Sequence, residues 1–242
     1  MKRLVRMSLS VLLALTFVLY GSPAARAEET TCQGFLGDVT VDNLLVPPDA
    51  SCILEGTKVM GTIKVENNAS LAARMVVVIG NVQAEGAQDV KVLSLSTVGG
   101  SIQIKQGGSA EIDEVNVTGD IQFESNNLAL GATHNQVGGS VQAFQNTGGV
   151  NIANNTIGGD VQVFQNTGGA NIAHNGIDGN LQCKENDPPP TGGNNVVQGN
   201  EEDQCANLTL QMEQQMFLSF VFLNLGAANG AAPPTPPVST IP

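Results

Sequence analysis

The sequence contains no tryptophan, one tyrosine and eight phenylalanines, and only 13% of its 242 residues are charged. Helical proteins of this length usually carry far more Glu, Lys, Arg and Leu, so the composition argues against an ordinary helix bundle. The single tyrosine is Tyr20, so a chain without its first 27 residues has neither Trp nor Tyr. Sugar-binding surfaces usually rely on the large apolar area and polar edges of such rings. This lack argues against a carbohydrate-active groove.

Basic residues are scarce as well. Ten Lys and Arg stand against 22 Asp and Glu, a formal net charge of −12. Four of the ten lie within the first 27 residues and every acid lies beyond them, so removal of that segment leaves a net charge of −16. Such a chain has little means of holding phosphates and would be repelled by anionic membranes. We therefore expect no nucleic-acid partner.

The first 27 residues have the pattern of a secretory signal peptide. A basic start (Lys2, Arg3, Arg6) precedes an apolar run from Leu9 to Tyr20, and small residues flank Arg26 at the end. The alternative, a transmembrane anchor, needs about 18 or more apolar residues. The sequence thus predicts a secreted, extracellular or periplasmic protein, associated with the cell envelope in the last case.

Four cysteines follow: Cys32, Cys52, Cys183 and Cys205. An even number in an exported chain predicts two disulfides, for which three pairings exist. Separations of 20 and 22 residues favour Cys32–Cys52 and Cys183–Cys205. The competing interpretation, a metal site, lacks any Cys-x-x-Cys pair, and the two histidines, His134 and His174, are 40 residues apart. We expect neither metal nor other cofactor.

A repeat of about 20 residues organises the region between the cysteines. Each copy has a Gly, a small polar residue and an apolar–Gln–apolar triplet, as in Gly139-Ser-Val-Gln-Ala and Gly159-Asp-Val-Gln-Val. The windows 138–157 and 158–177 are identical at 15 of 20 positions. Earlier copies with Thr or Lys in place of Gln begin at Gly37 and Gly61.

The local pattern within each copy is that of short strands. Apolar residues alternate with polar ones in the triplet. Clusters of Gly, Asn and Thr, which are typical of turns, separate the short apolar stretches of each copy. No helical apolar stripe occurs in this region, and the Leu-x-x-Leu-x-Leu pattern of leucine-rich repeats is absent. We predict an all-β fold, a single-stranded parallel β-helix solenoid of about eight coils of about 20 residues. Residues one coil apart would then be stacked neighbours, and each cysteine pair would join two coils at one end of the solenoid.

Residues 37 to about 200 resemble the right-handed parallel β-helix superfold, the pectate-lyase-like class, and the short coils also resemble those of bactofilin-type polymerising proteins. The resemblance lies in repeat length and pattern, and it points to no specific family. It implies right-handed coils. It brings no set of catalytic residues onto this sequence.

The outward ladders are the candidate surface chemistry. The middle residues of the triplets stack as Gln83, Gln103, Gln122, Gln142, Gln162 and Gln182, and further Asn residues stack as Asn126, Asn146, Asn166 and Asn186. Stacked amides can hydrogen-bond from coil to coil. Two interpretations remain open: the ladders only stabilise the stack, or they form a flat polar face for a repetitive partner such as a polysaccharide. Phe144 and Phe164 also stack, either inward at a corner or as an exposed platform.

Catalysis is not expected. A lyase of the β-helix class would need a basic residue and clustered acids for Ca²⁺, but Arg74 has no basic neighbour in the coil pattern. Asp38, Asp120 and Asp160 share the place after the repeat glycine, too sparsely for a cage. The best acidic cluster is Glu111 with Asp113-Glu114, which turn solvation explains equally well.

The chain divides into a signal peptide at 1–27, a β-helix domain at 28–205, an apolar capping or docking segment at 206–226, and a flexible tail rich in Pro and Ala at 227–242. Helical spacing of Met212, Met216 and Phe220 predicts a C-terminal capping helix. The expected function is that of a structural or binding protein without catalysis, with a polysaccharide or envelope component as partner. The first alternative is a polysaccharide-binding or polysaccharide-degrading protein. The second is a surface protein that self-assembles through its coil ends or its C-terminal apolar segment.

Overall fold

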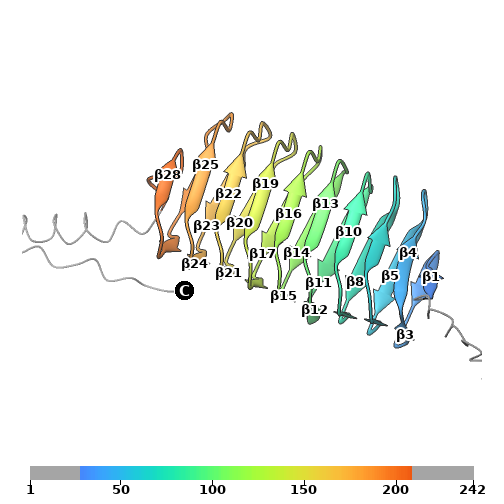
Figure 1. Cartoon of the computed structure of the whole chain (residues 1–242). Helices are drawn as coiled ribbons and strands as arrows, with labels where there is room; N and C mark the ends of the chain where they lie inside the picture. The colour runs from blue at the N-terminus through green and yellow to red at the C-terminus, as the bar shows by residue number, and fades with distance from the viewer. Residues whose placement is uncertain (1–27, 209–242) are drawn as a thin grey trace, which may run out of the picture.

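The computed structural model describes residues 28–208 of the chain. These residues form a parallel β-helix, in which the chain winds through three strands per turn and each strand pairs in parallel with the equivalent strands one turn before and after it (Figure 1). Within 28–208 every element is a strand, so the all-β prediction is confirmed. The predicted signal peptide (1–27), the flexible tail (227–242) and, apart from 206–208, the capping or docking segment (206–226) with its predicted helix lie outside the described residues.

The first of the three faces is sheet A, which has ten strands. They are β1 (Glu29–Thr31), β4 (Asn43–Val46), β7 (Ile63–Val65), β10 (Val82–Glu85), β13 (Ile102–Lys105), β16 (Ile121–Glu124), β19 (Val141–Phe144), β22 (Val161–Phe164), β25 (Leu181–Lys184) and β28 (Glu201–Asp203). This sheet contains the apolar–Gln–apolar triplets.

Sheet B follows sheet A in each turn and has nine strands. They are β2 (Gly34–Leu36), β5 (Ser51–Glu55), β8 (Ser70–Arg74), β11 (Asp89–Leu93), β14 (Ser109–Asp113), β17 (Leu130–Thr133), β20 (Val150–Ala153), β23 (Ala170–Ala173) and β26 (Thr191–Gly193).

Sheet C completes the turn with nine shorter strands. They are β3 (Thr40–Val41), β6 (Lys58–Val59), β9 (Val77–Val78), β12 (Ser96–Val98), β15 (Val115–Val117), β18 (Gln136–Val137), β21 (Thr156–Ile157), β24 (Gly176–Ile177) and β27 (Val196–Val197). The prediction of about eight coils is confirmed: the three sheets give nine three-stranded turns, the first of them short, followed by β28. At about 4.8 Å per coil the stack is roughly 40 Å long.

The core is a set of apolar columns that run along the solenoid axis. In sheet A, Val141 pairs with Val161 and Ala143 with Val163, and all four are fully buried. Both predicted inward columns are confirmed: Val82, Ile102, Ile121, Val141, Val161 and Leu181 form one, and Ala84, Ile104, Phe123, Ala143, Val163 and Cys183 form the other. The sheets thus enclose one continuous core.

The repeat glycines stand where the backbone of one coil approaches the next most closely. A Cβ added to Gly80 would lie 2.6 Å from the carbonyl oxygen of Gly61, and one added to Gly159 would lie 2.8 Å from the carbonyl carbon of Gly139. Atoms cannot approach so closely, so any larger residue would push adjacent coils apart. The glycine that marks the repeat is therefore required by the spacing between coils at this corner.

One repeat copy predicted from the sequence is misplaced. The triplet after Gly37 ends in β3 of sheet C, and the sheet A strand of that coil is β4, where Leu44 pairs with Ile63. Asp42 occupies the glycine place, since its carbonyl oxygen accepts a hydrogen bond from the N–H of Gly61. The step from Gly37 to Gly61, 24 residues against the usual 19 or 20, already departed from the period.

A cysteine pair joins two coils at each end of the solenoid. Cys32 and Cys52 are at disulfide-bonding distance with their Cα atoms 5.6 Å apart, and Cys183 and Cys205 likewise with 5.2 Å between Cα atoms. All four side chains are buried. The predicted pairing, one coil apart, is the pairing that the structure brings together.

Candidate binding face

The outer surface of sheet A carries a continuous ladder of glutamine amides, here called the glutamine face. The Nε2 of each glutamine donates to the Oε1 of the glutamine one coil further on. The donor–acceptor distances are 3.2 Å for Gln83–Gln103, 2.8 Å for Gln103–Gln122, 2.8 Å for Gln122–Gln142, 2.8 Å for Gln142–Gln162 and 2.9 Å for Gln162–Gln182. All six predicted side chains therefore form one hydrogen-bonded row.

The ladder has a direction and a defined end. Every Nε2 donates toward the C-terminal end, and the row stops at Glu202, whose Oε2 accepts from Gln182 at 2.9 Å. An amide has two N–H donors and an acceptor oxygen with two lone pairs. Within the row each amide uses one donor and one lone pair, so the remaining donor and lone pair of each inner glutamine are available to a ligand.

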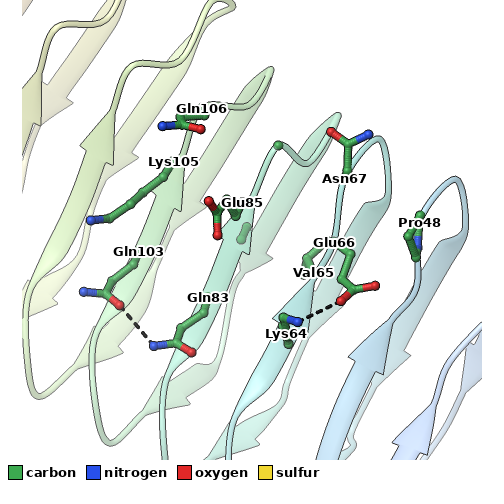
Figure 2. A pocket seen from close by; sticks show the side chains of 12 residues that line it. Pro48, Lys64, Val65, Glu66, Asn67, Gln83, Glu85, Gln103, Lys105 and Gln106 are labelled. Atoms are coloured by element: carbon green, nitrogen blue, oxygen red, sulfur yellow. Dashed lines mark hydrogen bonds and ion pairs between the residues drawn. The ribbon is translucent and has the colours of Figure 1, made fainter.

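A second outward column runs beside the glutamines. In register from coil to coil it contains Glu85, Lys105, Glu124, Phe144, Phe164 and Lys184. Lys105 and Glu124 form an ion pair at 2.8 Å between adjacent coils. Lys64 lies in the column of the glutamines, next to Gln83, and its Nζ is 2.7 Å from Glu66 Oε1 (Figure 2). This hydrogen bond raises the pKa of Lys64 above its ordinary value.

Two shallow depressions lie on this same face. The first, of about 680 Å³, is lined by residues that include Lys64, Glu66, Gln83, Glu85 and Lys105, and Figure 2 shows these side chains along neighbouring strands. The second, of about 510 Å³, is lined by Glu124, Phe144, Gln145, Phe164, Gln165, Lys184 and Glu185. Both depressions follow the solenoid axis, one toward each end of the glutamine face.

Phe144 and Phe164 point outward into the second depression. Their side chains are half-buried, and the ring centroids are 5.3 Å apart with an angle of 22° between the planes. The alternative of an inward turn at a corner is therefore wrong. Because the rings stack on each other, each turns one face toward its neighbour and away from any ligand.

The asparagines that were expected on the surface are buried. Asn126, Asn146 and Asn166 are fully inaccessible and Asn186 is 5% exposed. The preceding residues, such as Gln145 and Gln165, have positive φ (56° and 58°), and this corner conformation reverses the alternation so that the next side chain points inward. This ladder is part of the core and offers nothing to a ligand.

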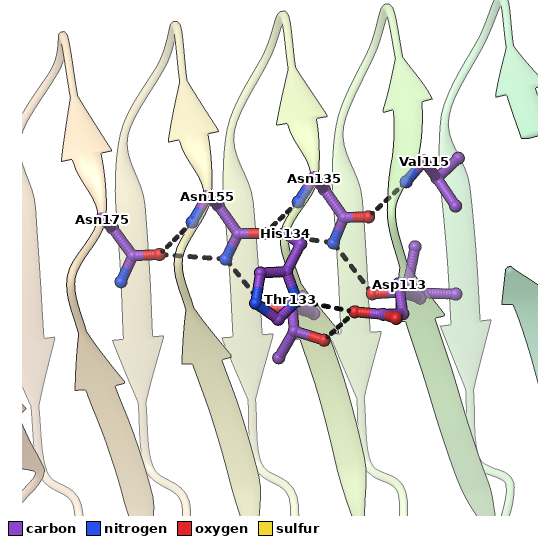
Figure 3. Close-up of polar contacts among 9 residues, drawn as sticks. Asp113, Val115, Thr133, His134, Asn135, Asn155 and Asn175 are labelled. Atoms are coloured by element: carbon purple, nitrogen blue, oxygen red, sulfur yellow. Dashed lines mark hydrogen bonds and ion pairs between the residues drawn. The ribbon is translucent and has the colours of Figure 1, made fainter. Parts of the chain in front are cut away.

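A second buried ladder, which the sequence interpretation missed, lies at the corner between sheets B and C (Figure 3). It consists of Asn135, Asn155, Asn175 and Asn195. Asn155 Nδ2 donates to Ala132 O at 2.8 Å and to Asn175 Oδ1 at 2.9 Å, while its Oδ1 accepts from the Asn135 backbone at 2.9 Å and from Asn135 Nδ2 at 3.1 Å. A residue spacing of 20 was the signal that could have found it.

Beside this ladder, Asp113 contacts two polar residues of the next coil, Thr133 and His134 (Figure 3). Thr133 Oγ1 donates to Asp113 Oδ1 at 2.5 Å, and His134 Nδ1 lies 2.9 Å from the same oxygen. Partial burial raises the pKa of Asp113, but the hydrogen bonds of Thr133 and His134 outweigh it, so the net pKa is below the ordinary value. The hydroxyl is bonded to the carboxylate and not to the imidazole, so this is not the nucleophile–base arrangement of a catalytic triad.

The other acids singled out from the sequence have structural partners. Asp120 Oδ1 accepts from the backbone N–H of Ser140 at 2.8 Å, and Asp160 Oδ1 from that of Asn180 at 2.7 Å. Asp38 is not equivalent to them, because the copy at Gly37 is misplaced. In residues 28–208 no group of three or more His, Cys, Asp or Glu side chains is placed to hold a metal ion. The same residues include no helix with the length and apolarity of a membrane span.

Comparison with known proteins gives no relative by sequence or by structure: no family model, curated protein or solved structure matches the chain.

Proposed function

We propose that the protein is a non-catalytic structural and binding protein that acts outside the cytoplasm, and that its glutamine face binds an extended polar polymer of the polysaccharide class. One observation carries this proposal: six amides in one line, hydrogen-bonded in the same direction over six coils. The two cysteine pairs support an oxidising compartment, since disulfides persist outside the reducing cytosol.

The shape of the array favours a polymer over a small ligand. Small-molecule sites are concave and place a few polar groups around one point. Here the free donors and acceptors repeat at the coil spacing of about 4.8 Å, over roughly 24 Å from Gln83 to Gln182. A chain of hydroxyl-bearing units that lies along the axis can pair with successive amides, because a hydroxyl both donates and accepts.

The pKa shifts of Lys64 and Asp113 do not suit these two groups to proton transfer near neutral pH. A general base or acid works best when its pKa lies near the working pH. The hydrogen bond to Glu66 raises the pKa of Lys64, away from neutrality. Asp113 is partly buried, but its hydrogen bonds to Thr133 and His134 lower its pKa overall, also away from neutrality. Both shifts are opposite to those that proton transfer would need.

Affinity electrophoresis in gels that contain soluble polysaccharides, with co-sedimentation on insoluble ones, tests the proposal. The test variant carries Gln103→Ala, Gln122→Ala and Gln142→Ala. The matched control carries three outward changes on sheet C, Asn116→Ala, Gln136→Ala and Thr156→Ala, which share one column. At about 1 kcal/mol per hydrogen bond, the test variant should bind about 100-fold more weakly and the control should bind normally.

Three outcomes would contradict the proposal. Equal loss in both variants would show that the glutamines act only through stability, and circular dichroism melts of each variant identify that case. Release of new reducing or unsaturated ends would favour the degrading alternative. Absence of binding to every polysaccharide, together with polymers that grow with protein concentration in sedimentation, would favour self-assembly.

A further inference from the structure

A second surface of the solenoid, unlike the polar glutamine face, carries exposed apolar side chains. Met60, Met75, Val77, Ile79 and Leu95 point outward from neighbouring coils at sheet C and at the corner between sheets B and C. We call these five residues the apolar band. Leu95 is 77% exposed and Ile79 is 51% exposed.

The fold does not require apolar residues at these positions, because later coils fold identically without them. The place of Val77 is taken by Thr97, Asn116, Gln136 and Thr156 in the following coils. The place of Leu95 is taken by Glu114, His134, Asn154 and His174, all with positive φ. The apolar band is thus a local addition near the N-terminal end of the solenoid, at positions where the later coils carry mostly polar residues.

The backbone conformation strengthens this point. Met75 and Leu95 have φ of 54° and 63°, in the left-handed region that Asn adopts more readily than Met or Leu. Each of these side chains is unfavourable both in conformation and in exposure. Their presence is explained if another group covers them.

Leu208, the last residue that the structure describes, lies at the same corner of the solenoid. The carbonyl oxygen of Leu208 accepts hydrogen bonds from the backbone N–H and Nδ2 of Asn195, at 3.2 and 2.7 Å. Asn195 lies in the corner column that also contains Ser96, the residue after Leu95, five coils away. Five coils correspond to about 24 Å.

We propose that the apolar band is covered by the segment 216–225 of the same chain. This segment, Met-Phe-Leu-Ser-Phe-Val-Phe-Leu-Asn-Leu, has no charged residue. Leu208 O stands one coil beyond Asn195 in this column, so the level of Leu95 is about six coils, roughly 29 Å, from Leu208. The eight Cα–Cα steps from Leu208 to residue 216 can span up to about 28 Å, so a fully extended linker brings residue 216 close to the level of Leu95. The occupant is therefore long enough, apolar enough and attached at the right corner.

A second copy of the chain fits the apolar band less well. The five partly exposed side chains offer a few hundred Å² of apolar surface. A stable protein–protein interface buries about 800 Å² on each partner. A tethered segment needs less area, because its attachment already holds it near the surface.

Oxidation of the band's own methionines tests the proposal. Full-length protein is treated with hydrogen peroxide, and sulfoxide at Met60 and Met75 is followed by peptide mass spectrometry. The variant Phe217→Asp, Phe220→Asp, Phe222→Asp should oxidise at both sites several-fold faster than the wild type. A control with the same added charge in the tail, Thr235→Asp, Val238→Asp, Ile241→Asp, should match the wild type.

A reciprocal measurement leaves the segment itself unchanged. In the variant Met75→Asn, Leu95→Asn, which keeps residue types that later coils use, chymotrypsin should cleave at Phe217, Phe220 and Phe222 several-fold faster than in the wild type. Equal oxidation rates in all chains, with equal cleavage rates, would overturn the proposal. Protection that grows with protein concentration would assign the apolar band to a second copy instead. Protection that appears only with lipid vesicles, or that is lost only when residues 1–27 are absent, would likewise overturn it.

Discussion

Asn146 and Asn166 lie one coil apart in the core, and the Oδ1 of Asn166 accepts two hydrogen bonds from Asn146, from its backbone N–H at 2.9 Å and from its Nδ2 at 2.9 Å. The same relationship recurs along both buried asparagine ladders. Each ladder ends at an acceptor, Gln204 Oε1 after Asn186 and Leu208 O after Asn195. The C-terminal end of the solenoid therefore satisfies the donors that the ladders direct toward it.

We expect Asn155→Ala to destabilise the fold by about 3 kcal/mol or more. The change removes the partner of the Asn135 backbone N–H and of one of the two N–H groups of Asn135 Nδ2, whose other N–H still donates to Ile112 O. It also removes the side-chain donor to Ala132 O and one of the two donors to Asn175 Oδ1. Buried groups left unpaired cost about 1–3 kcal/mol each. Urea unfolding followed by circular dichroism measures the loss.

The matched control is Gln142→Ala, which interrupts the glutamine face. Water can replace both of its ladder bonds because the side chain is only partly buried. A loss of about 1 kcal/mol or less is expected. Equal losses in the two variants would contradict the distinction between a structural ladder and a surface ladder.

The repeat could be predicted because its period and the strand alternation both act on buried residues. Val141 and Val161 are 20 positions apart, and their stacking follows from that spacing alone. The side on which Asn146 lies could not be obtained in this way, since the positive φ of Gln145 interrupts the alternation. Glutamine is not a residue type that is typical of positive φ, so the sequence gives no sign of this conformation.

The glycine at the start of each repeat gives a test of coil spacing. Gly80→Ala should destabilise the protein by about 2 kcal/mol or more, because the new Cβ would lie 2.6 Å from Gly61 O, a backbone atom that cannot move independently. At Gly176 a Cβ would meet nothing within 4 Å, so Gly176→Ala should change stability by about 0.5 kcal/mol at most, or increase it. Thermal and urea unfolding of both variants decide the matter, and a Gly80→Ala protein as stable as Gly176→Ala would refute the close approach.

The cluster around Asp113 gives a pH dependence. Partial burial is outweighed by the hydrogen bonds of Thr133 and His134, so the folded-state pKa of Asp113 lies below its unfolded value. The carboxylate therefore contributes stability that is fully present above the unfolded pKa of about 3.9 and is lost as the pH falls through the folded-state pKa. Asp113→Asn should reduce stability at about pH 6 and have little effect at about pH 2. A stability difference that does not change between these pH values would show that the contacts of Asp113 do not depend on its charge.

As with the fold, one part of the candidate site could be predicted from the sequence and another part could not. The glutamine face was predictable, because its residues lie in strands with a constant alternation. The pair of Asp113 and His134 was not, although both residues were noticed, because their separation of 21 residues is one more than the period and places them at a corner. Corners break the simple rule that residues 20 apart are neighbours and residues 21 apart are not.

The last prediction concerns Asn175-Gly176, a dipeptide that in unfolded chains loses ammonia readily when the glycine nitrogen attacks the asparagine side chain. In the fold Asn175 is 1% exposed, and its Nδ2 donates to Ile152 O and Asn195 Oδ1 at 2.9 and 3.0 Å. The Gly176 N–H donates to Asn155 O at 2.8 Å. Both reacting groups are therefore held by other partners, and we expect no deamidation at this site over a period in which the urea-unfolded chain deamidates completely. Peptide mass spectrometry after incubation at mildly alkaline pH measures the conversion.

The variant Asn195→Ala gives a second test, because it removes one of the two acceptors of Asn175 Nδ2 and the acceptor of the Asn175 backbone N–H, while the dipeptide itself is unchanged. Opening of the last coils should then become more frequent, and deamidation at Asn175 should rise in proportion to the population of the open form. Equal, rapid deamidation in the native wild type would mean that Asn175 is not held in the ladder. Because reaction at this one residue requires the ladder to open, its rate reports the stability of the C-terminal coils directly.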